Sequence, residues 1–201
     1  MKIIFGIELY LMKFELCEIK TKINNLKTSS SEEVISSDTF TPASVLIPLY
    51  EKDNITYLLF TKRTEKVRHH KGQICFPGGK FDIGDKDLET TALRETYEEI
   101  GIKEQDITIL GKINNMVTIT NFIVSPYVGS FSYPYDFKVS TDEIDEIIEV
   151  PLYHLLDKKN FREEIREIND IKYPIYYYYF NNYIIWGVTG KILFDFITIL
   201  S

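Results

Sequence analysis

The amino-acid sequence predicts an α/β protein in which a mixed β-sheet lies between helices, an α/β/α sandwich. Three observations support this fold class. Short runs of β-branched and aromatic residues, typical of strands, recur after residue 41. A central segment, 87–100, has the period of a helix, and segment 189–200 is a candidate for a final helix. With 201 residues, 44% of them hydrophobic, the chain can bury one core, so we expect one domain.

Four apolar runs are the expected strands of the first two thirds of the chain. Residues 43–50 and 55–60 are separated by the polar turn 51–54, as in a hairpin. Residues 107–113 and 122–128 follow the central helical segment. Strands on both sides of a helix favour the layered fold.

The central helix is predicted by spacing. Small or apolar side chains occur at every fourth position: Leu88, Ala92, Thr96 and Ile100. Gly101 then ends the helix, because glycine readily adopts the left-handed conformation that follows a helix. Asp85 or Asp87 is placed to cap its first turn.

The C-terminal third predicts a second helix and a hairpin. Residues 142–156 are amphipathic, and we expect them to be helical. Strands are expected at 175–180 and 183–186, on either side of Asn181-Asn182, whose side chains tolerate the positive φ of a tight turn.

The chain divides at about residue 40. Residues 1–40 form an accessory segment that ends in a polar stretch, and residues 41–201 form the compact domain.

Charge and cysteine content exclude several classes of function. With 23 Lys+Arg against 30 Asp+Glu, the net charge is −7, so we expect no nucleic-acid partner and no acidic membrane surface. Cys17 and Cys75 lie far apart and form no disulfide framework or zinc motif, which suits a reduced, cytoplasmic setting. Residues 1–17 lack the unbroken apolar run of a signal peptide or membrane span.

Three glutamates are the candidate centre of the chemistry. On a helix, Glu95, Glu98 and Glu99 fall within one quadrant. Like charges at these spacings destabilise a helix by roughly 0.2–0.5 kcal/mol each, and a hard divalent ion relieves that repulsion. The cofactor we expect is Mg²⁺ or Mn²⁺. Taken alone, however, such a string is more often a solvated helix face. Arg94 lies one turn before Glu98 and can pair with it.

The wider segment resembles the Nudix box. Residues 78–102 read GGKFDIGDKDLETTALRETYEEIGI, with a glycine loop before the helix and Gly101-Ile102 after it. Thr96 departs from the box, which usually has an aliphatic or small residue there, and the loop is one residue longer, with Asp85 in place of the usual loop glutamate. The resemblance implies a Nudix fold and metal-dependent cleavage of a nucleoside-diphosphate derivative. It implies that the metal ligands are Glu95, Glu98, Glu99 and Gly79.

A second block is similar to the coenzyme A diphosphatases of that superfamily. Residues 58–79 read LLFTKRTEKVRHHKGQICFPGG. The resemblance implies that the substrate is coenzyme A, cleaved to 3′,5′-ADP and 4′-phosphopantetheine. It implies a substrate-binding set of Arg63, Arg68, His70, Gly78 and Gly79. A further catalytic carboxylate outside the box is expected at Glu143 or Glu146.

Two other functions stay open at this point. One is a Nudix hydrolase that acts on ADP-ribose, a dinucleotide or capped RNA, since the box handles only the diphosphate. The other is a Nudix domain that binds nucleotides without catalysis. The sequence is compatible with a homodimer.

Overall fold

The computed structural model describes residues 15–26, 39–66, 71–168 and 170–201. Its helices, including two short 3-10 turns η1 and η2, are α2 (Leu16–Asn24), α4 (Leu88–Ile100), η1 (Glu104–Asp106), α5 (Leu152–Leu156), η2 (Lys158–Asn160) and α6 (Gly187–Leu200). Its strands are β1 (Thr41–Lys52), β2 (Ile55–Arg63), β3 (Ile74–Cys75), β4 (Gly78–Lys80), β5 (Ile107–Lys112), β6 (Met116–Val117), β7 (Phe122–Phe131), β8 (Ile144–Pro151), β9 (Phe161–Ile168), β10 (Ile171–Phe180) and β11 (Tyr183–Ile185).

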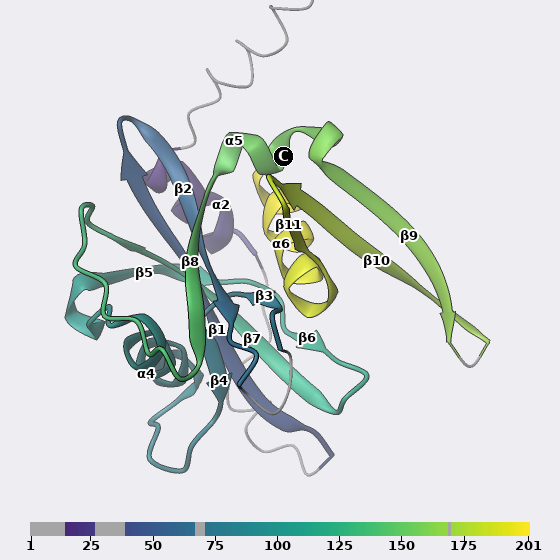
Figure 1. The fold of residues 1–201 in the computed structure, drawn as a ribbon, viewed down its shortest axis with the longest axis horizontal. Coiled ribbons are helices and arrows are strands. Elements are labelled where there is room, and N and C mark those ends of the chain that lie inside the picture. Colours follow the sequence, from purple (N-terminus) through teal and green to yellow (C-terminus); the bar gives the residue numbers. More distant parts are fainter. Residues whose placement is uncertain (1–14, 27–38, 67–70, 169) are drawn as a thin grey trace, which may run out of the picture.

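The larger sheet is mixed, as the sequence predicts. It has eight strands along the path β3-β2-β1-β7-β5, with β4 beside β1, β6 beside β7 and β8 beside β2. β1 and β7 run parallel, with Thr41 opposite Phe122, whereas the other pairs are antiparallel. A second, three-stranded antiparallel sheet has the order β11-β10-β9 and extends away from the first (Figure 1).

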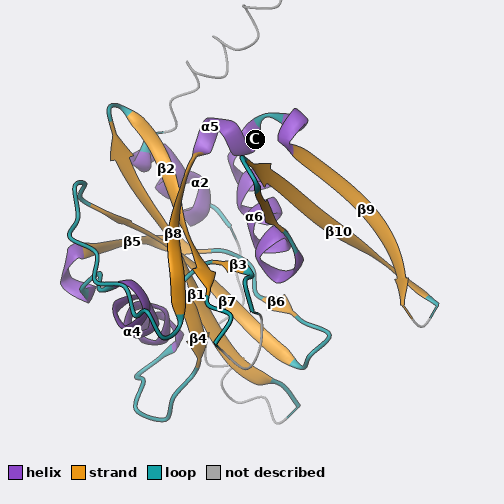
Figure 2. Cartoon of the chain, in the orientation of Figure 1, coloured by secondary structure: helices purple, strands orange, loops and turns teal. Residues whose placement is uncertain are grey.

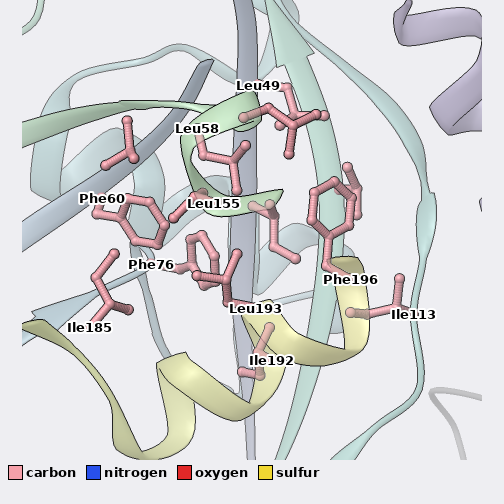
Figure 3. Close-up of a cluster of buried hydrophobic side chains, with 14 of the residues drawn as sticks. Leu49, Leu58, Phe60, Phe76, Ile113, Leu155, Ile185, Ile192, Leu193 and Phe196 are labelled. Carbon is pink, nitrogen blue, oxygen red and sulfur yellow. The ribbon is translucent and has the colours of Figure 1, made fainter. Parts of the chain in front are cut away.

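Helices cover both faces of the larger sheet, which confirms the α/β/α arrangement (Figure 2). Because side chains alternate along a strand, Leu46 of β1 packs with Leu88 and Ala92 of α4, while its neighbour Ile47 belongs to the opposite cluster. That opposite cluster includes Phe196 of α6 (Figure 3). α4 is therefore held against one face of the larger sheet.

The expected N-terminal strands, the central helix, the Asn181 hairpin and the final helix are confirmed within a few residues. Asp87 is the N-cap of α4, since its Oδ1 accepts the Thr90 amide at 2.8 Å. Gly101 ends the helix at φ 76°. Asn181 has φ 53°, as the tight turn requires.

The expected helix at 142–156 is wrong. Most of it is strand β8, and only the last turn is the helix α5. Isoleucines at positions 144, 147 and 148 imitate helical spacing, but pairing with β2 fixes an extended backbone. In that strand the side chains of Ile148 and Val150, two residues apart, both point into the core. The sequence pattern is therefore compatible with the period of a helix and with that of a strand, and pairing with β2 selects the strand.

Helix α2 lies within the segment that the sequence sets apart from the domain. Ile19 and Ile23 are 0% and 2% exposed and belong to the main core cluster. Ile23 fills the space beside Gly111 of β5, where a Cβ would lie 2.6 Å from its Cγ2. The Lys22 ammonium donates to the Leu200 carbonyl at the end of α6, 2.7 Å away. Residues 16–24 thus pack into the same core as the sheet.

Candidate functional site

Glu99 faces the sheet rather than solvent. Its side chain is 2% exposed, and its Oε1 lies 3.3 Å from Nη1 of Arg63, at the end of β2. Its other oxygen, Oε2, is buried and accepts no hydrogen bond from any described residue. Burial raises the pKa of Glu99 to about 8, even though the Arg63 guanidinium acts in the opposite direction. The fold therefore holds a carboxylate that lacks a full counter-charge.

Glu95 lies against the glycine loop. β4 pairs with β1 and so brings Gly79 beside α4. A Cβ added to Gly79 would lie 2.4 Å from the carboxyl carbon of Glu95, so only glycine leaves room for that side chain. Burial also raises the pKa of Glu95, against the effect of the Arg94 guanidinium.

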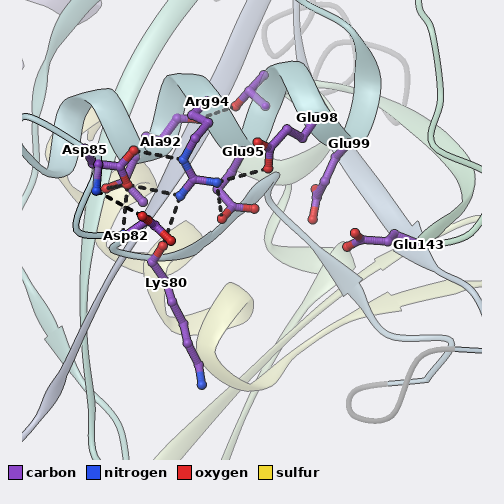
Figure 4. Close-up of polar contacts among 12 residues, drawn as sticks. Lys80, Asp82, Asp85, Ala92, Arg94, Glu95, Glu98, Glu99 and Glu143 are labelled. Atoms are coloured by element: carbon purple, nitrogen blue, oxygen red, sulfur yellow. Dashed lines mark hydrogen bonds and ion pairs between the residues drawn. The ribbon is translucent and has the colours of Figure 1, made fainter.

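Arg94 joins the loop to the helix (Figure 4). Its Nη1 donates to Glu95 at 2.9 Å and to Glu98 at 3.0 Å, which confirms the expected pairing with Glu98. Its Nη2 also donates to the Lys80 carbonyl at 3.2 Å. The rest of the guanidinium binds Asp85, which is therefore an ion-pair partner and not the helix cap. Sequence spacing gave no sign of that pairing, because the two residues lie nine apart.

The structure separates the two candidate carboxylates outside the box. Glu143 lies 3.5 Å from Nη2 of Arg63, so one arginine lies between Glu143 and Glu99, and both point toward the same space (Figure 4). Glu146 instead accepts the Tyr183 hydroxyl at 2.6 Å. Nothing in the sequence pattern indicated that tyrosine as its partner. Of the two, only Glu143 is brought to the helix carboxylates.

The basic block is partly described. Arg68 and His70 lie outside the described residues. Lys62 pairs with Asp145 at 2.9 Å and is 4.0 Å from Glu146. A cavity of about 380 Å³ lies beside the block, lined by Lys62, Arg63, Thr64, Glu65, Lys66, Thr141, Ile144 and Asp145. Arg63 therefore contacts the carboxylates of Glu99 and Glu143 and also lines this cavity.

The surroundings of Cys75 disfavour the thiolate form. Its thiol lies 3.3 Å from the Thr61 hydroxyl, and burial raises the pKa of the thiol to about 11. At neutral pH it stays protonated, as expected of a packed cysteine.

The donor set suits a hard divalent cation. The buried oxygen of Glu99 has no partner among described residues, and Glu95 and Glu98 add carboxylate oxygens from the same helix face. No three His, Cys, Asp or Glu side chains in the described part of the chain already converge as ligands. Each of the three glutamates contacts an arginine, Arg94 for Glu95 and Glu98 and Arg63 for Glu99. The residues thus fit a metal that replaces these arginine contacts.

Comparisons with known proteins show the family of the chain. A model of the NUDIX domain matches residues 40–168. Nudix hydrolase 3 of Caenorhabditis elegans is 30% identical over 197 residues, covering 89% of this chain and 82% of that protein. The uncharacterized Nudix hydrolase NudL of Photorhabdus laumondii is 33% identical over 157 residues, covering 78% of this chain and 83% of that protein. The crystal structure of the MutT protein from Methanosarcina mazei is 27% identical, with a TM-score of 0.47, and covers 60% of this chain and 84% of that one.

Among the described helices, none is both long and apolar enough to cross a membrane.

Proposed function

This chain belongs to the NUDIX domain family and is a Nudix hydrolase of nucleoside-diphosphate derivatives, and from that premise we propose that its substrate is coenzyme A or a coenzyme A derivative. The reaction would add water across the diphosphate. One P–O bond forms and one breaks, giving 3′,5′-ADP and 4′-phosphopantetheine.

The observation that carries the catalytic part of this proposal is the orphaned oxygen of Glu99. One oxygen of Glu99 pairs with Arg63 and the other is buried without a partner among the described residues, which is costly for the ionised carboxylate, so a cation beside this oxygen and the two further glutamates would be favourable. Nudix hydrolases generally use divalent metal ions. We assign Glu95, Glu98 and Glu99, with the Gly79 carbonyl, as the groups that would hold Mg²⁺ or Mn²⁺. When bound, such an ion polarises the diphosphate and lowers the pKa of a water.

The chain's own residues would then orient the reactants. Asp85 fixes Arg94, which sets the rotamers of Glu95 and Glu98. Glu143 lies at the edge of the carboxylate cluster and is our candidate to accept the proton of the attacking water. Arg63, once released from Glu99, would neutralise charge on the phosphoryl oxygens.

The choice of coenzyme A rests on the second sequence block. In the described part of this block, Arg63 contacts Glu99 and also lines the 380 Å³ cavity, whose cationic side chains are Lys62, Arg63 and Lys66 and whose acidic side chains are Glu65 and Asp145. A diphosphate at the carboxylates would have these cations beside it. Coenzyme A carries a 3′-phosphate in addition to its diphosphate, and that group needs a second set of cationic side chains. A dinucleotide without this phosphate has no such requirement. Arg68 and His70 keep their proposed role in the same block.

The test is a panel of substrates. Products of coenzyme A, dephospho-coenzyme A, ADP-ribose, NADH and a capped dinucleotide should be identified by mass spectrometry with Mg²⁺ and with Mn²⁺. We expect 3′,5′-ADP from coenzyme A and the highest kcat/KM on that substrate. A much higher kcat/KM on ADP-ribose, NADH or the capped dinucleotide would overturn the choice of coenzyme A as substrate. The assignment of the chain as a Nudix hydrolase would still stand. No metal-dependent turnover of any of them, together with nucleotide binding, would favour a non-catalytic domain.

A further inference from the structure

Thr64 follows the last residue of β2 and is only 7% exposed. Its amide donates to the Glu143 carbonyl at 2.9 Å, and its hydroxyl donates to the Asp142 carbonyl at 3.1 Å. The same hydroxyl accepts the Lys66 amide at 3.3 Å. One buried threonine therefore binds the carbonyls of both peptide groups that flank the Cα of Glu143.

A β-bulge brings Glu143 to this threonine. In the ladder between β2 and β8 the register shifts at Arg63, which lies opposite Ile144 because the pairing passes over Asp145. In the unshifted register Ile144 would lie opposite Thr64, and Glu143 would fall one residue further along. Bulges are common beside active sites, where they redirect a side chain. Here the bulge places the backbone of Glu143 within reach of Thr64.

The turn before Glu143 is fixed to the helix that carries the carboxylates. The Ser140 amide donates to the Glu99 carbonyl at 2.9 Å, and the Ser140 carbonyl accepts the Glu143 amide at 3.0 Å. The Glu99 carbonyl belongs to the last turn of α4, whose carbonyls have no partner within the helix. The backbone of Glu143 is therefore held between the end of β2 and the end of α4.

The side chain of Glu143 has weaker support than its backbone. It is 53% exposed, and its contact with Nη2 of Arg63 is long, at 3.5 Å. Figure 4 shows its carboxylate directed toward that of Glu99. In the proposed reaction Arg63 turns to the phosphoryl oxygens, which removes this contact. The place of the Glu143 carboxylate then depends on its backbone.

We propose that Thr64 is a positioning residue for Glu143, and that it holds the backbone from which this carboxylate reaches the attacking water. The inference rests on the proposed function, in which Glu143 accepts the proton of that water. Thr64 itself takes no proton. Its hydroxyl acts on the reaction through the distance between Glu143 and the water, to which a positioned proton transfer is sensitive.

Substitutions of Thr64 test the role of the hydroxyl. Thr64→Val keeps the shape of the side chain but leaves the Asp142 carbonyl and the Lys66 amide without this partner. On the best substrate of the panel, we expect kcat to fall about tenfold with little change in KM. Thr64→Ser keeps the hydroxyl and should retain a kcat within about twofold of wild type. Ser140→Ala is the matched control, because the turn uses the backbone groups of Ser140, and its kcat should equal that of wild type.

The division between kcat and KM separates this role from substrate binding. Thr64 also lines the 380 Å³ cavity. A threonine that binds substrate there would raise KM when its hydroxyl is removed, with kcat unchanged. That result, or an equal loss of kcat in Thr64→Ser and Thr64→Val, would contradict a positioning role.

A double-mutant cycle tests whether Thr64 acts through Glu143. Glu143→Gln should lower kcat by about 100-fold or more, since a general base is lost. Adding Thr64→Val to Glu143→Gln should lower kcat no further, because there is no base left to position. A further tenfold loss in the double variant would show that Thr64 acts by another route and would overturn the inference.

The same cycle distinguishes failure of the inference from failure of the proposed function. A wild-type kcat in Glu143→Gln would remove Glu143 as the proton acceptor, and the inference with it. A low kcat in Glu143→Gln beside a wild-type kcat in Thr64→Val would refute only the role of Thr64. Thermal melts of every variant report whether the fold is kept. Thr64→Ala also lacks the hydroxyl and completes the cycle if Thr64→Val does not fold.

Discussion

The guanidinium of Arg94 donates two hydrogen bonds to the carboxylate of Asp85, from Nε to Oδ1 at 2.8 Å and from Nη2 to Oδ2 at 3.0 Å. This fork ties the loop before α4 to the middle of the helix. It leaves Nη1 of the same arginine to hold Glu95 and Glu98. The loop carboxylate thus acts on the glutamates through the arginine.

Asp85→Asn should destabilise the protein by about 2–3 kcal/mol, because a charge-assisted contact with a buried carboxylate is lost. The Arg94 guanidinium lowers the pKa of Asp85 to about 2. A folded-state pKa below the unfolded value of about 3.9 gives stability that is complete above that value and is lost as the pH falls toward 2. Urea unfolding at pH 6, 4 and 3 should show that the difference in free energy of unfolding between wild type and variant becomes smaller as the pH falls. Asp82→Asn, in the exposed part of the same loop, is the control and should show no such trend.

Glu99→Gln should stabilise the protein in EDTA while abolishing most turnover. The pKa of Glu99 is raised in the fold to about 8, above an unfolded value of about 4.3. Its favourable contribution is therefore complete below pH 4.3 and is lost as the pH rises to 8. The melting temperature of the variant should exceed that of wild type by more at pH 8 than at pH 5. Glu98→Gln, with a side chain 55% exposed, is the matched comparison and should show a smaller dependence on pH. A gap in melting temperature that is the same at both pH values would contradict the buried-charge account.

Gly79→Ala should keep the fold and lower kcat by tenfold or more. The added methyl group meets the movable end of Glu95, so that carboxylate must shift from its place. Gly78→Ala meets backbone instead, at 2.4 Å from the Ser44 carbonyl oxygen, and should lower the melting temperature. Thermal melts and turnover of the pair separate a displaced carboxylate from a disturbed fold. Equal losses of stability in both would refute the distinction.

Arg63→Ala should raise KM for coenzyme A, at a cost of about 1.5–3 kcal/mol if a charge-assisted phosphate contact is lost. Dephospho-coenzyme A lacks the 3′-phosphate and serves as the internal control. If Arg63 reads that group, its removal should leave kcat/KM on the dephospho form nearly unchanged; if it holds the diphosphate, both substrates should lose equally. Lys66→Ala, in the exposed part of the same block, should matter less for either. Unchanged kinetics on both substrates would remove Arg63 from the binding set.

Ile23→Ala should destabilise the domain by about 2–5 kcal/mol, the usual cost of emptying a buried isoleucine site. The side chain is 2% exposed and packs beside Gly111. The midpoint of chemical denaturation should fall strongly in this variant. Cys17→Ser, at an exposed position of the same helix, should leave the midpoint unchanged. A wild-type midpoint for Ile23→Ala would show that α2 is a detachable accessory. The boundary at residue 40 remains a prediction, and this measurement bears on it.

Local signals predicted the parts of the fold that local chemistry determines. The helix from Asp87 to Gly101 was readable because a capping aspartate, a four-residue period and a terminal glycine agree. β8 was misread because isoleucines at 144, 147 and 148 satisfy two periods, and only its pairing with β2 decides. β9 was not predicted, because its sequence, FREEIREI, is mostly charged and its strand state comes from β10.

In the site too, the sequence predicted what local spacing determines and missed what tertiary contacts determine. The three glutamates of α4 were predicted from helical spacing, but their unequal surroundings were not. Glu99 is buried while Glu98 is half exposed, since only one of them turns toward β2. The choice between Glu143 and Glu146 depends on contacts between residues far apart in the sequence, with Arg63 for Glu143 and with Tyr183 for Glu146, and only the folded chain brings these residues together.

The parallel pairing of β1 with β7 also determines when the site can assemble. Thr41 and Phe122 must meet across about 80 residues of chain before this ladder forms, and closing so long a loop is slow. α4 and the glycine loop lie inside that closed loop. The helix can form early from its own cap, yet Gly79 and Arg63 reach its carboxylates only through β1 and β2. Gly79 and Arg63 therefore join the helix carboxylates only once the strands have paired, and a cation that needs the Gly79 carbonyl as well as the glutamates binds the folded domain and not an isolated helix.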